Sequence, residues 1–169
     1  YIRTKHKGVA SARNTGLDLA KGEFVVWQDA DDVSLPNRLE RLLEGFRFPN
    51  VAIVHSDMLL IDKDGHPIGY WQSHQHRRSL TERFMLEVGT PFNNSTMMIR
   101  RSVIGTIRFN EELKIGEDTD MVVRLAEHVD SLHIPEPLVL YRRHTGSLTC
   151  RPNAQELFLH VYSFLERHS

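Results

Sequence analysis

Residues 24–32 have the sequence FVVWQDADD, a short apolar stretch that ends abruptly in the carboxylates Asp29, Asp31 and Asp32. A continuous apolar run of this length, rich in β-branched and aromatic residues, favours a strand that is buried on both faces. Ligands of open α/β sheets bind at the carboxyl ends of such strands. The stretch therefore predicts a buried strand with a polar site at its end.

The acidic turn, residues 28–32, crowds Asp29, Asp31 and Asp32 into four positions. Like charges at this spacing cost free energy unless a cation or hydrogen bonds offset them. Mg²⁺ and Mn²⁺ prefer carboxylate oxygens and are often shared with substrate phosphates. The turn therefore predicts a divalent-cation site, although an acidic turn that only caps the next helix remains open at this point.

The remaining sequence alternates helix and strand patterns. Helices are predicted over residues 9–20, 35–46, 79–88, 118–127 and 153–167. The second of these has Ser34 as its cap and an apolar stripe of Leu35, Leu39, Leu42, Leu43 and Phe46. Strands are predicted over 24–27, 51–54, 96–99, 132–134 and 138–141, with a kink at Pro135 and Pro137 and a hairpin that joins 58–61 to 68–71. This order indicates an α/β domain with a partly parallel sheet.

Composition excludes several classes of protein. The chain has 169 residues, of which 40% are hydrophobic and 25% are charged, as in ordinary globular domains. A net charge of -1 gives no field that would attract nucleic acid. Cys150 is the only cysteine, so an internal disulfide is excluded and a reducing, cytoplasmic compartment is expected. Because Tyr1 falls in the middle of a pattern, we expect the chain to be part of a longer protein.

Two enzyme classes carry an Asp-x-Asp pair after an apolar strand. Residues 29–33, DADDV, are similar to the nucleophile motif of haloacid-dehalogenase-type phosphatases. That class also needs a lysine and an acidic pair on separate elements, and Lys114 lies very close to Glu117 and Asp118 here. The second class is the nucleotide-sugar glycosyltransferases of the GT-A fold.

The surroundings of the acidic turn distinguish the two classes. The chain has GVASARNTGL at 8–17, AKGEF at 20–24, DADD at 29–32 and PNRLE at 36–40. In this order and spacing, the segments resemble the central block of family-2 glycosyltransferases. Residues 116–126, GEDTDMVVRLA, and residues 137–147, with YRRHTGS at their end, resemble two later segments of that family.

The resemblance implies a fold and an activity. The fold is α/β, a GT-A mixed sheet flanked by helices, with residues 1–169 as one domain that forms its central and C-terminal part. The family's first strands, which carry much of the uridine site, have no counterpart here, so the domain is expected to be N-terminally incomplete and to leave a sheet edge open. The activity is transfer of a sugar from a nucleoside-diphosphate sugar, UDP-linked, to an acceptor hydroxyl, with a metal ion and with inversion.

The resemblance also implies roles for individual residues. Asp118 is the expected general base, with Glu117 beside it. The expected ligands of Mg²⁺ or Mn²⁺ are Asp31, Asp29 and His144, and the expected nucleotide-sugar contacts are Arg13, Asn14, Asp29, Asp31 and Arg142. From the residues alone, Glu117 and Asp118 also fit acids that merely stabilise a helix N-terminus.

The partners implied are a nucleotide-sugar donor and a saccharide or lipid-linked acceptor, with no nucleic acid. A cytoplasmic location is expected, and the family also allows peripheral association with the cytoplasmic face of a membrane. The segment from His66 through Trp71 to Asn94 is either a saccharide platform or a polar loop. A non-catalytic binding or assembly module remains an alternative, as does the phosphatase, and the oligomeric state is left open.

Overall fold

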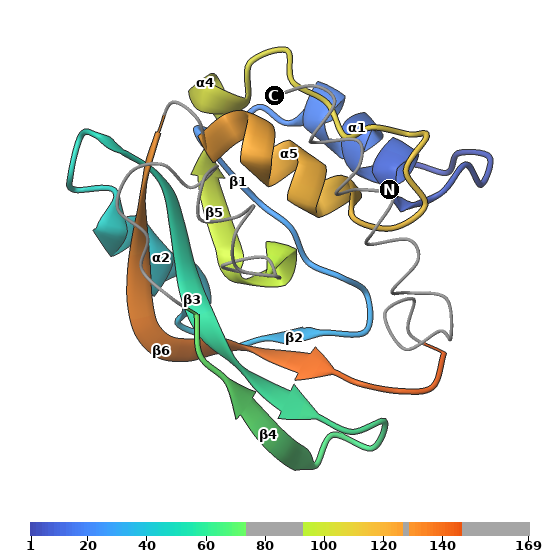
Figure 1. Ribbon diagram of the computed structural model, residues 1–169, viewed down its shortest axis with the longest axis vertical. Helices are drawn as coiled ribbons and strands as arrows, with labels where there is room; N and C mark the ends of the chain where they lie inside the picture. The colour runs from blue at the N-terminus through green and yellow to red at the C-terminus, as the bar shows by residue number, and fades with distance from the viewer. Residues whose placement is uncertain (74–92, 127–128, 147–169) are drawn as a thin grey trace.

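A computed structural model describes residues 1–73, 93–126 and 129–146 (Figure 1). Its six strands form one sheet: β1 (Phe24–Val26), β2 (Val33–Ser34), β3 (Val51–Ile61), β4 (Pro67–Trp71), β5 (Met97–Arg100) and β6 (Asp130–Arg142). The spatial order is β1-β5-β3-β6-β2, and β4 pairs with β3. The β3–β6 pair is parallel and the other pairs are antiparallel. Since β1 is the end strand of this order, one of its edges has no partner strand within the described residues.

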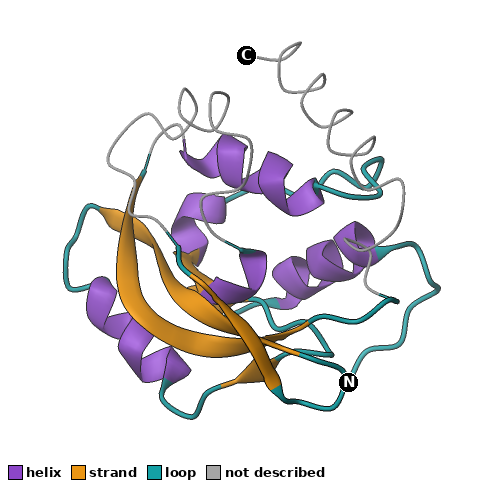
Figure 2. Cartoon of the chain, turned by 60° about the horizontal axis from the view of Figure 1, so that its bottom comes forward, coloured by secondary structure: helices purple, strands orange, loops and turns teal. Residues whose placement is uncertain are grey.

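Helices lie on both faces of the sheet (Figure 2). They are α1 (Val9–Leu19), α2 (Arg38–Gly45), the short α4 (Arg101–Ile104), α5 (Glu117–Ala126) and the 3₁₀ turn η1 (Asn94–Thr96). One apolar cluster joins α1, α4 and α5 to the sheet through residues such as Ala10, Ile53, Ile99, Ile104 and Met121. A second cluster joins α2 to the other face through Leu42, Phe46, Val54, Met98 and Leu138. The predicted α/β architecture with a mixed sheet is confirmed.

Strand β3 is longer than the sequence predicted. The expected strands at 51–54 and 58–61 are one continuous strand of 11 residues, almost all of it buried. The polar residues His55, Ser56 and Asp57 interrupt the apolar pattern, which is why the sequence suggested a break. They remain in the strand because neighbouring elements supply partners: the Asp57 carboxylate accepts hydrogen bonds from the Ser73 N–H (2.8 Å) and contacts His133 Nε2 (2.7 Å).

Strand β6 is also continuous where a proline kink was predicted. Its partners on β3 change register at this point, with Ile134 opposite Ser56 and Pro137 opposite Asp57. Pro135 therefore lies in an irregularity of the ladder, where a missing N–H donor breaks no regular hydrogen bond. The strand can thus continue past both prolines to Arg142.

Helix α2 differs from the prediction in its start and in its buried face. Ser34 does not cap it, because Ser34 belongs to β2 and pairs with Val139. The helix begins at Arg38, and its buried residues are Arg38, Leu42 and Gly45. The predicted stripe was wrong at Leu39 and Leu43, which are 56% and 44% exposed.

The other predicted elements have mixed outcomes. The helix at 9–20, the strands at 24–27 and 96–99, the hairpin and the helix at 118–127 are confirmed within one or two residues. The short α4 was not predicted, since four residues are too few to show a period. The predicted helices at 79–88 and 153–167 lie outside the described residues. Among the residues that are described, no helix combines the length and apolarity needed to cross a membrane.

Two glycines test this packing. A Cβ at Gly45 would lie 2.7 Å and 2.8 Å from the methyl carbons of Val54, whereas a Cβ at Gly16, in α1, would meet nothing within 4 Å. We expect Gly45→Ala to lower the free energy of unfolding by about 1–3 kcal/mol through overpacking. Gly16→Ala, the matched control, should raise it by about 0.5–1 kcal/mol because a flexible residue leaves a helix interior. Urea unfolding measures both, and a neutral Gly45→Ala would contradict the packing of α2.

Candidate active site

The acidic turn follows β1 and returns the chain to the sheet. Trp27 is buried, and the Asp32 N–H donates to the Asp29 carbonyl at 3.2 Å, which closes the turn before β2 begins at Val33. The turn therefore stands at the carboxyl end of a strand, as the sequence predicted.

Arg13 of α1 connects the acidic turn to the start of α5. Its guanidinium donates through Nη1 to Glu117 Oε1 at 2.6 Å and through Nη2 to Asp29 Oδ1 at 3.1 Å. The Arg13 and Glu117 side chains are only 11% and 8% exposed, so water screens this pair weakly. The cation also lies over the Phe109 ring, 5.4 Å from its centre. Two acidic segments far apart in sequence thus share one buried cation.

Glu117 and Asp118 open α5 directly after Gly116, whose φ of 81° suits glycine. Burial raises the pKa of Asp118, and the nearby Asp29 carboxylate adds to this, while Arg13 acts in the opposite direction. Burial likewise raises the pKa of Glu117, with a further rise from Asp118 and a smaller opposing effect of Arg13. A raised pKa in a cluster of acids is a common property of groups that take part in proton transfer.

The end of β6 contacts the other side of the acidic turn. The Arg142 N–H donates to Asp32 Oδ1 at 2.9 Å, and Arg142 Nε donates to the Asp31 carbonyl at 2.9 Å. His144 Nε2 lies 3.1 Å from Asp31 Oδ2, and both side chains are accessible to solvent. Burial raises the pKa of Asp32, and its Oδ2 has no hydrogen-bond partner in the described part of the chain.

Two residues that support the turn were not assigned from the sequence. The Ser95 hydroxyl donates to Asp29 Oδ2 at 3.2 Å. The fully buried Arg38 donates to the Ser95 carbonyl, to the Trp27 carbonyl at 3.1 Å and to Gln28 Oε1 at 2.9 Å. Burial lowers the pKa of Arg38 to about 10, while the carboxylates of Asp32 and Asp29 favour its charged form. The available signal was the spacing of Arg38 with Leu42 and Gly45, which places it on the inner side of α2.

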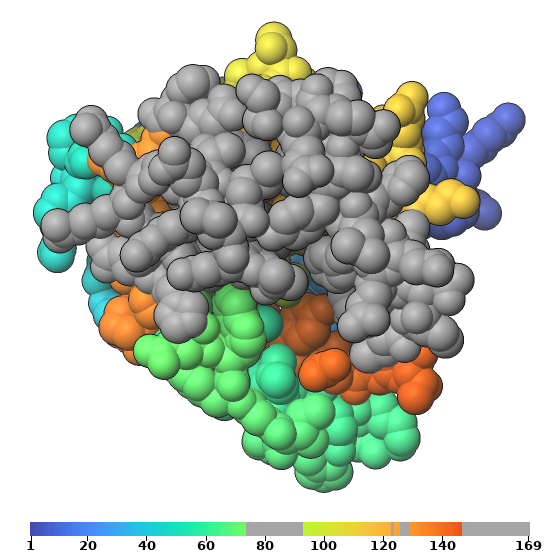
Figure 3. Space-filling view, in the orientation of Figure 1, coloured from blue at the N-terminus to red at the C-terminus, as the bar shows by residue number. Residues whose placement is uncertain are grey.

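Asn14 and Arg142, predicted as nucleotide-sugar contacts, already have several protein partners. Asn14 exchanges two hydrogen bonds with the Phe109 backbone, at 2.8 Å and 2.9 Å, and its Nδ2 also contacts Glu111. Arg142 donates through Nη1 to the carbonyls of Asp62 and Lys63. In the space-filling view, the end of β6 and the β3–β4 hairpin lie side by side, as these bonds require (Figure 3).

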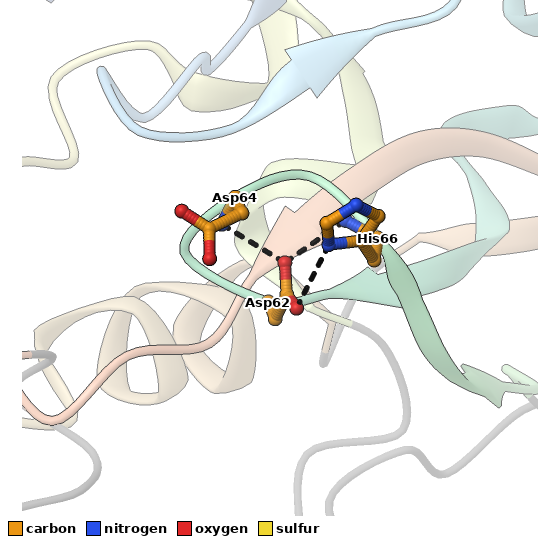
Figure 4. Close-up of side chains that lie close together, drawn as sticks. All are labelled: Asp62, Asp64 and His66. Atoms are coloured by element: carbon orange, nitrogen blue, oxygen red, sulfur yellow. Dashed lines mark hydrogen bonds and ion pairs between the residues drawn. The ribbon is translucent and has the colours of Figure 1, made fainter.

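The predicted metal set is brought together only in part. His144 and Asp31 are paired, while Asp29 is engaged by Arg13 and Ser95. Among the described residues, the only three acid or imidazole groups with ligand atoms all within 4.8 Å of one another are Asp62, Asp64 and His66 (Figure 4).

The cluster of Asp62, Asp64 and His66 is explained by the hairpin turn itself. Asp62 Oδ1 accepts hydrogen bonds from the N–H groups of Asp64 and His66, each at 2.9 Å. An aspartate that bonds the backbone two residues ahead is a common turn device, and Gly65 supplies the positive φ of 94° that the turn needs. The hydrogen bonds of the turn are therefore enough to explain why these three side chains lie close together.

Comparison with known proteins identifies the family. The model of "Glycosyl transferase family 2" matches residues 1–108. The chain belongs to this family. The haloacid-dehalogenase alternative is thereby set aside, and the predicted family is confirmed.

Curated relatives of this glycosyltransferase family 2 chain are longer than the chain itself. An uncharacterized glycosyltransferase of Methanocaldococcus jannaschii is 22% identical over 167 residues, which cover 97% of this chain and 57% of that protein. Chondroitin synthase of Escherichia coli is 31% identical over 137 residues, or 79% of this chain and 19% of that protein. The chain thus spans little more than half of one relative and about a fifth of the other.

Solved structures show the same fold. S. aureus TarS 1-349, crystallised in complex with UDP-GlcNAc, has a TM-score of 0.67 at 17% identity, covering 97% of this chain and 48% of that one. The complex of TarS 1-349 with UDP has a TM-score of 0.63 at 16% identity, covering 94% and 45%. The predicted GT-A fold of this glycosyltransferase family 2 chain is confirmed.

The shared cation predicts how the site titrates. In Arg13→Met, the pKa of Glu117 and of Asp118 should rise further, because Arg13 lowers both. A folded-state pKa above the unfolded value means that stability is greatest below the unfolded pKa and falls as pH rises through the folded pKa. As the pH rises from the unfolded pKa to the folded pKa of these two acids, the variant should lose more stability than the parent. Carboxyl-carbon NMR measures the two pKa values, and Arg101→Met, which removes an exposed arginine, is the control. An unchanged pKa of Asp118 in Arg13→Met would contradict the bridge.

Proposed function

We propose that the protein transfers a sugar from a UDP-linked donor to an acceptor hydroxyl, with a divalent cation and with inversion at the sugar carbon. The observation that supports the proposal is the Arg13 bridge, because Arg13 bonds both Asp29 of the acidic turn and Glu117 at the start of α5. Membership of glycosyl transferase family 2 and the fold shared with TarS, whose complexes contain UDP and UDP-GlcNAc, support it.

Asp31 and His144 are the proposed contacts of Mg²⁺ or Mn²⁺, and Asp29 is a third proposed ligand. Their oxygen and imidazole atoms suit either ion, and the unpartnered Oδ2 of Asp32 leaves a further oxygen available. When bound, the cation would supply positive charge that stabilises the departing diphosphate. Asp29 can meanwhile orient the donor or a water molecule, since Arg13 and Ser95 fix its carboxylate.

Asp118 is the proposed general base. It is partly buried at the start of α5, and a raised pKa makes its carboxylate a stronger base than an ordinary aspartate. The acceptor hydroxyl would lose its proton to Asp118 as it attacks the sugar. Only one carboxylate is given a direct role in bond formation, so a single displacement with inversion is the simpler course.

Arg13, Asn14 and Arg142 complete the proposed nucleotide-sugar side of the site. Arg13 is charged and close to both acidic segments, so it can also meet a diphosphate oxygen. Asn14 and Arg142 act through the segments that they hold: Asn14 fixes the Phe109 backbone, and Arg142 holds the acidic turn against the β3–β4 hairpin. A nucleotide that binds here would therefore contact segments whose positions are fixed before it binds.

The acceptor is proposed to be a saccharide or a lipid-linked saccharide. Chondroitin synthase, a relative by sequence, is named for a polysaccharide product. A cytoplasmic location at or near the inner face of a membrane belongs to the same proposal.

Removing the proposed base tests the chemistry. Asp118→Asn should lower the transfer rate by about 10²–10⁴-fold, because the variant lacks the carboxylate that takes the proton from the attacking sugar hydroxyl. UDP binding, measured by calorimetry with Mn²⁺, should change little. The measurement is UDP release from UDP-GlcNAc or a related UDP-sugar, made on the whole protein that contains this chain. Glu112→Gln, at an exposed acid outside the site, is the control. Transfer that survives Asp118→Asn rejects the base assignment.

A second pair of variants decides which acids hold the cation. Asp31→Asn should weaken Mn²⁺-dependent UDP binding by at least about tenfold, since loss of even an outer-shell partner of a metal typically costs this much. Asp64→Asn removes a carboxylate from the hairpin cluster and should leave UDP binding unchanged. Mn²⁺ binding by electron paramagnetic resonance and UDP binding by calorimetry provide the readouts. Weaker UDP and Mn²⁺ binding in Asp64→Asn, with unchanged binding in Asp31→Asn, would instead assign the cation to the hairpin cluster.

A further inference from the structure

Unpartnered polar atoms gather around Ser95, beside the acidic turn. Asn94 is 3% exposed, and neither its Nδ2 nor its Oδ1 has a hydrogen-bond partner within the described residues. The buried Oδ2 of Asp32 and the buried Nε of Arg38 likewise have no hydrogen-bond partner among the described residues. Asn94 precedes Ser95 in the chain, Arg38 donates to the Ser95 carbonyl, and the Ser95 hydroxyl lies close enough to Asp32 to lower its pKa.

A buried amide without hydrogen-bond partners lowers the stability of the folded protein. A buried donor or acceptor without a partner costs about 1–3 kcal/mol, and native proteins leave few of them. Other asparagines of this chain are bonded: Asn14 exchanges two hydrogen bonds with the Phe109 backbone, and Asn93 accepts from the Ser95 N–H at 2.8 Å. Leucine, which has the same branching as asparagine but no polar atoms, would avoid this cost. The two unpaired amide atoms therefore indicate a ligand that supplies a donor for Oδ1 and an acceptor for Nδ2.

The chemistry of the amide narrows the class of ligand. A carboxamide offers one acceptor and one donor group side by side, which complements two adjacent hydroxyl groups, each able to donate and to accept. The next residue, Ser95, donates to Asp29, and Asp29 is joined through Arg13 to Glu117. Asn94 is thus one residue away from the chain of contacts that joins the acidic turn to Glu117, next to the proposed base.

We propose that the Asn94 carboxamide binds two neighbouring hydroxyl groups of a sugar ring and determines which sugar the site accepts. This inference rests on the proposed function, since it takes the ligand of the site to be a nucleotide sugar and its acceptor. The ring belongs to the donor or to the acceptor, and the experiment separates these two sources.

The test compares two neighbouring asparagines in the whole protein. Asn94→Leu replaces the unpartnered amide by two methyl groups on the same branched skeleton, and Asn94→Ala removes the amide without needing these larger groups to fit. Asn93→Leu is the matched control, because it removes an amide that has a partner. The readouts are the melting temperature, calorimetric binding of UDP and of UDP-GlcNAc with Mn²⁺, and UDP release with and without a panel of methyl glycosides as acceptors.

We expect Asn94→Leu to melt about 2–4 °C higher than the parent, and Asn93→Leu to melt lower. If the ring is the donor's, UDP-GlcNAc binds about tenfold more weakly while UDP binding is unchanged. If it is the acceptor's, binding of both is unchanged and the KM for the methyl glycoside rises about tenfold. Either result supports the proposal.

Two results would overturn it. One is a lower melting temperature in both Asn94→Leu and Asn94→Ala, which assigns the amide a structural role. The other is unchanged UDP-GlcNAc binding together with an unchanged acceptor KM. Failure of the proposed function is a separate outcome, because the parent protein would then bind no UDP in the presence of Mn²⁺.

Discussion

The largely shielded Arg13 guanidinium, whose side chain is 11% exposed, holds together acidic segments that would otherwise repel each other. Asp29 and Glu117 are 88 positions apart in sequence, yet both bond to this one cation. A buried charge is tolerated only when it is paired, and a carboxylate left without its partner in such a place costs several kcal/mol. The pairing therefore constrains α1, the end of β1 and the start of α5 at once. The same three segments share an apolar cluster through Ala10, Trp27 and Met121, so packing and charge favour one arrangement.

The long parallel pair of strands brings the second half of the site into place. Strand β6 passes two prolines by shifting its register against β3 and so reaches Arg142 without a break. Its last residue then bonds the acidic turn on one side and the β3–β4 hairpin on the other. His144, two residues further along the chain, lies 3.1 Å from Asp31. The irregularity at the prolines is thus a condition for the site, since a strand that ended there would leave Asp31 without this neighbour.

Local patterns predicted the segments of the site but not the contacts between them. The acidic turn after an apolar strand and the acids before a helix are visible over a few residues, and the family resemblance joined them. The partners of Arg13, Asn14 and Arg142 depend on pairs about a hundred residues apart, which leave no local period. Arg38 shows the limit most clearly: a charged residue that directly precedes Leu39 of the predicted apolar stripe suggests an exposed helix face, whereas Leu39 is exposed and Arg38 is buried.

The buried Asp57 and the partly buried Asp32 differ in how many of their polar atoms the protein pairs. Burial alone would raise the pKa of Asp57, but hydrogen bonds from Tyr70, Ser73 and His133 outweigh it and lower the pKa. At Asp32, burial prevails over the Arg142 N–H, and one oxygen has no partner within the described chain. The first carboxylate is in the middle of the β3 ladder, where the protein supplies every partner that the charge needs. The second is in the acidic turn at the end of β1, and its Oδ2 is left without a hydrogen bond from the described residues. A carboxylate stabilised as fully as Asp57 would have little left to offer a cation or a sugar, and this difference supports the proposal that ligands bind at the acidic turn rather than in the middle of β3.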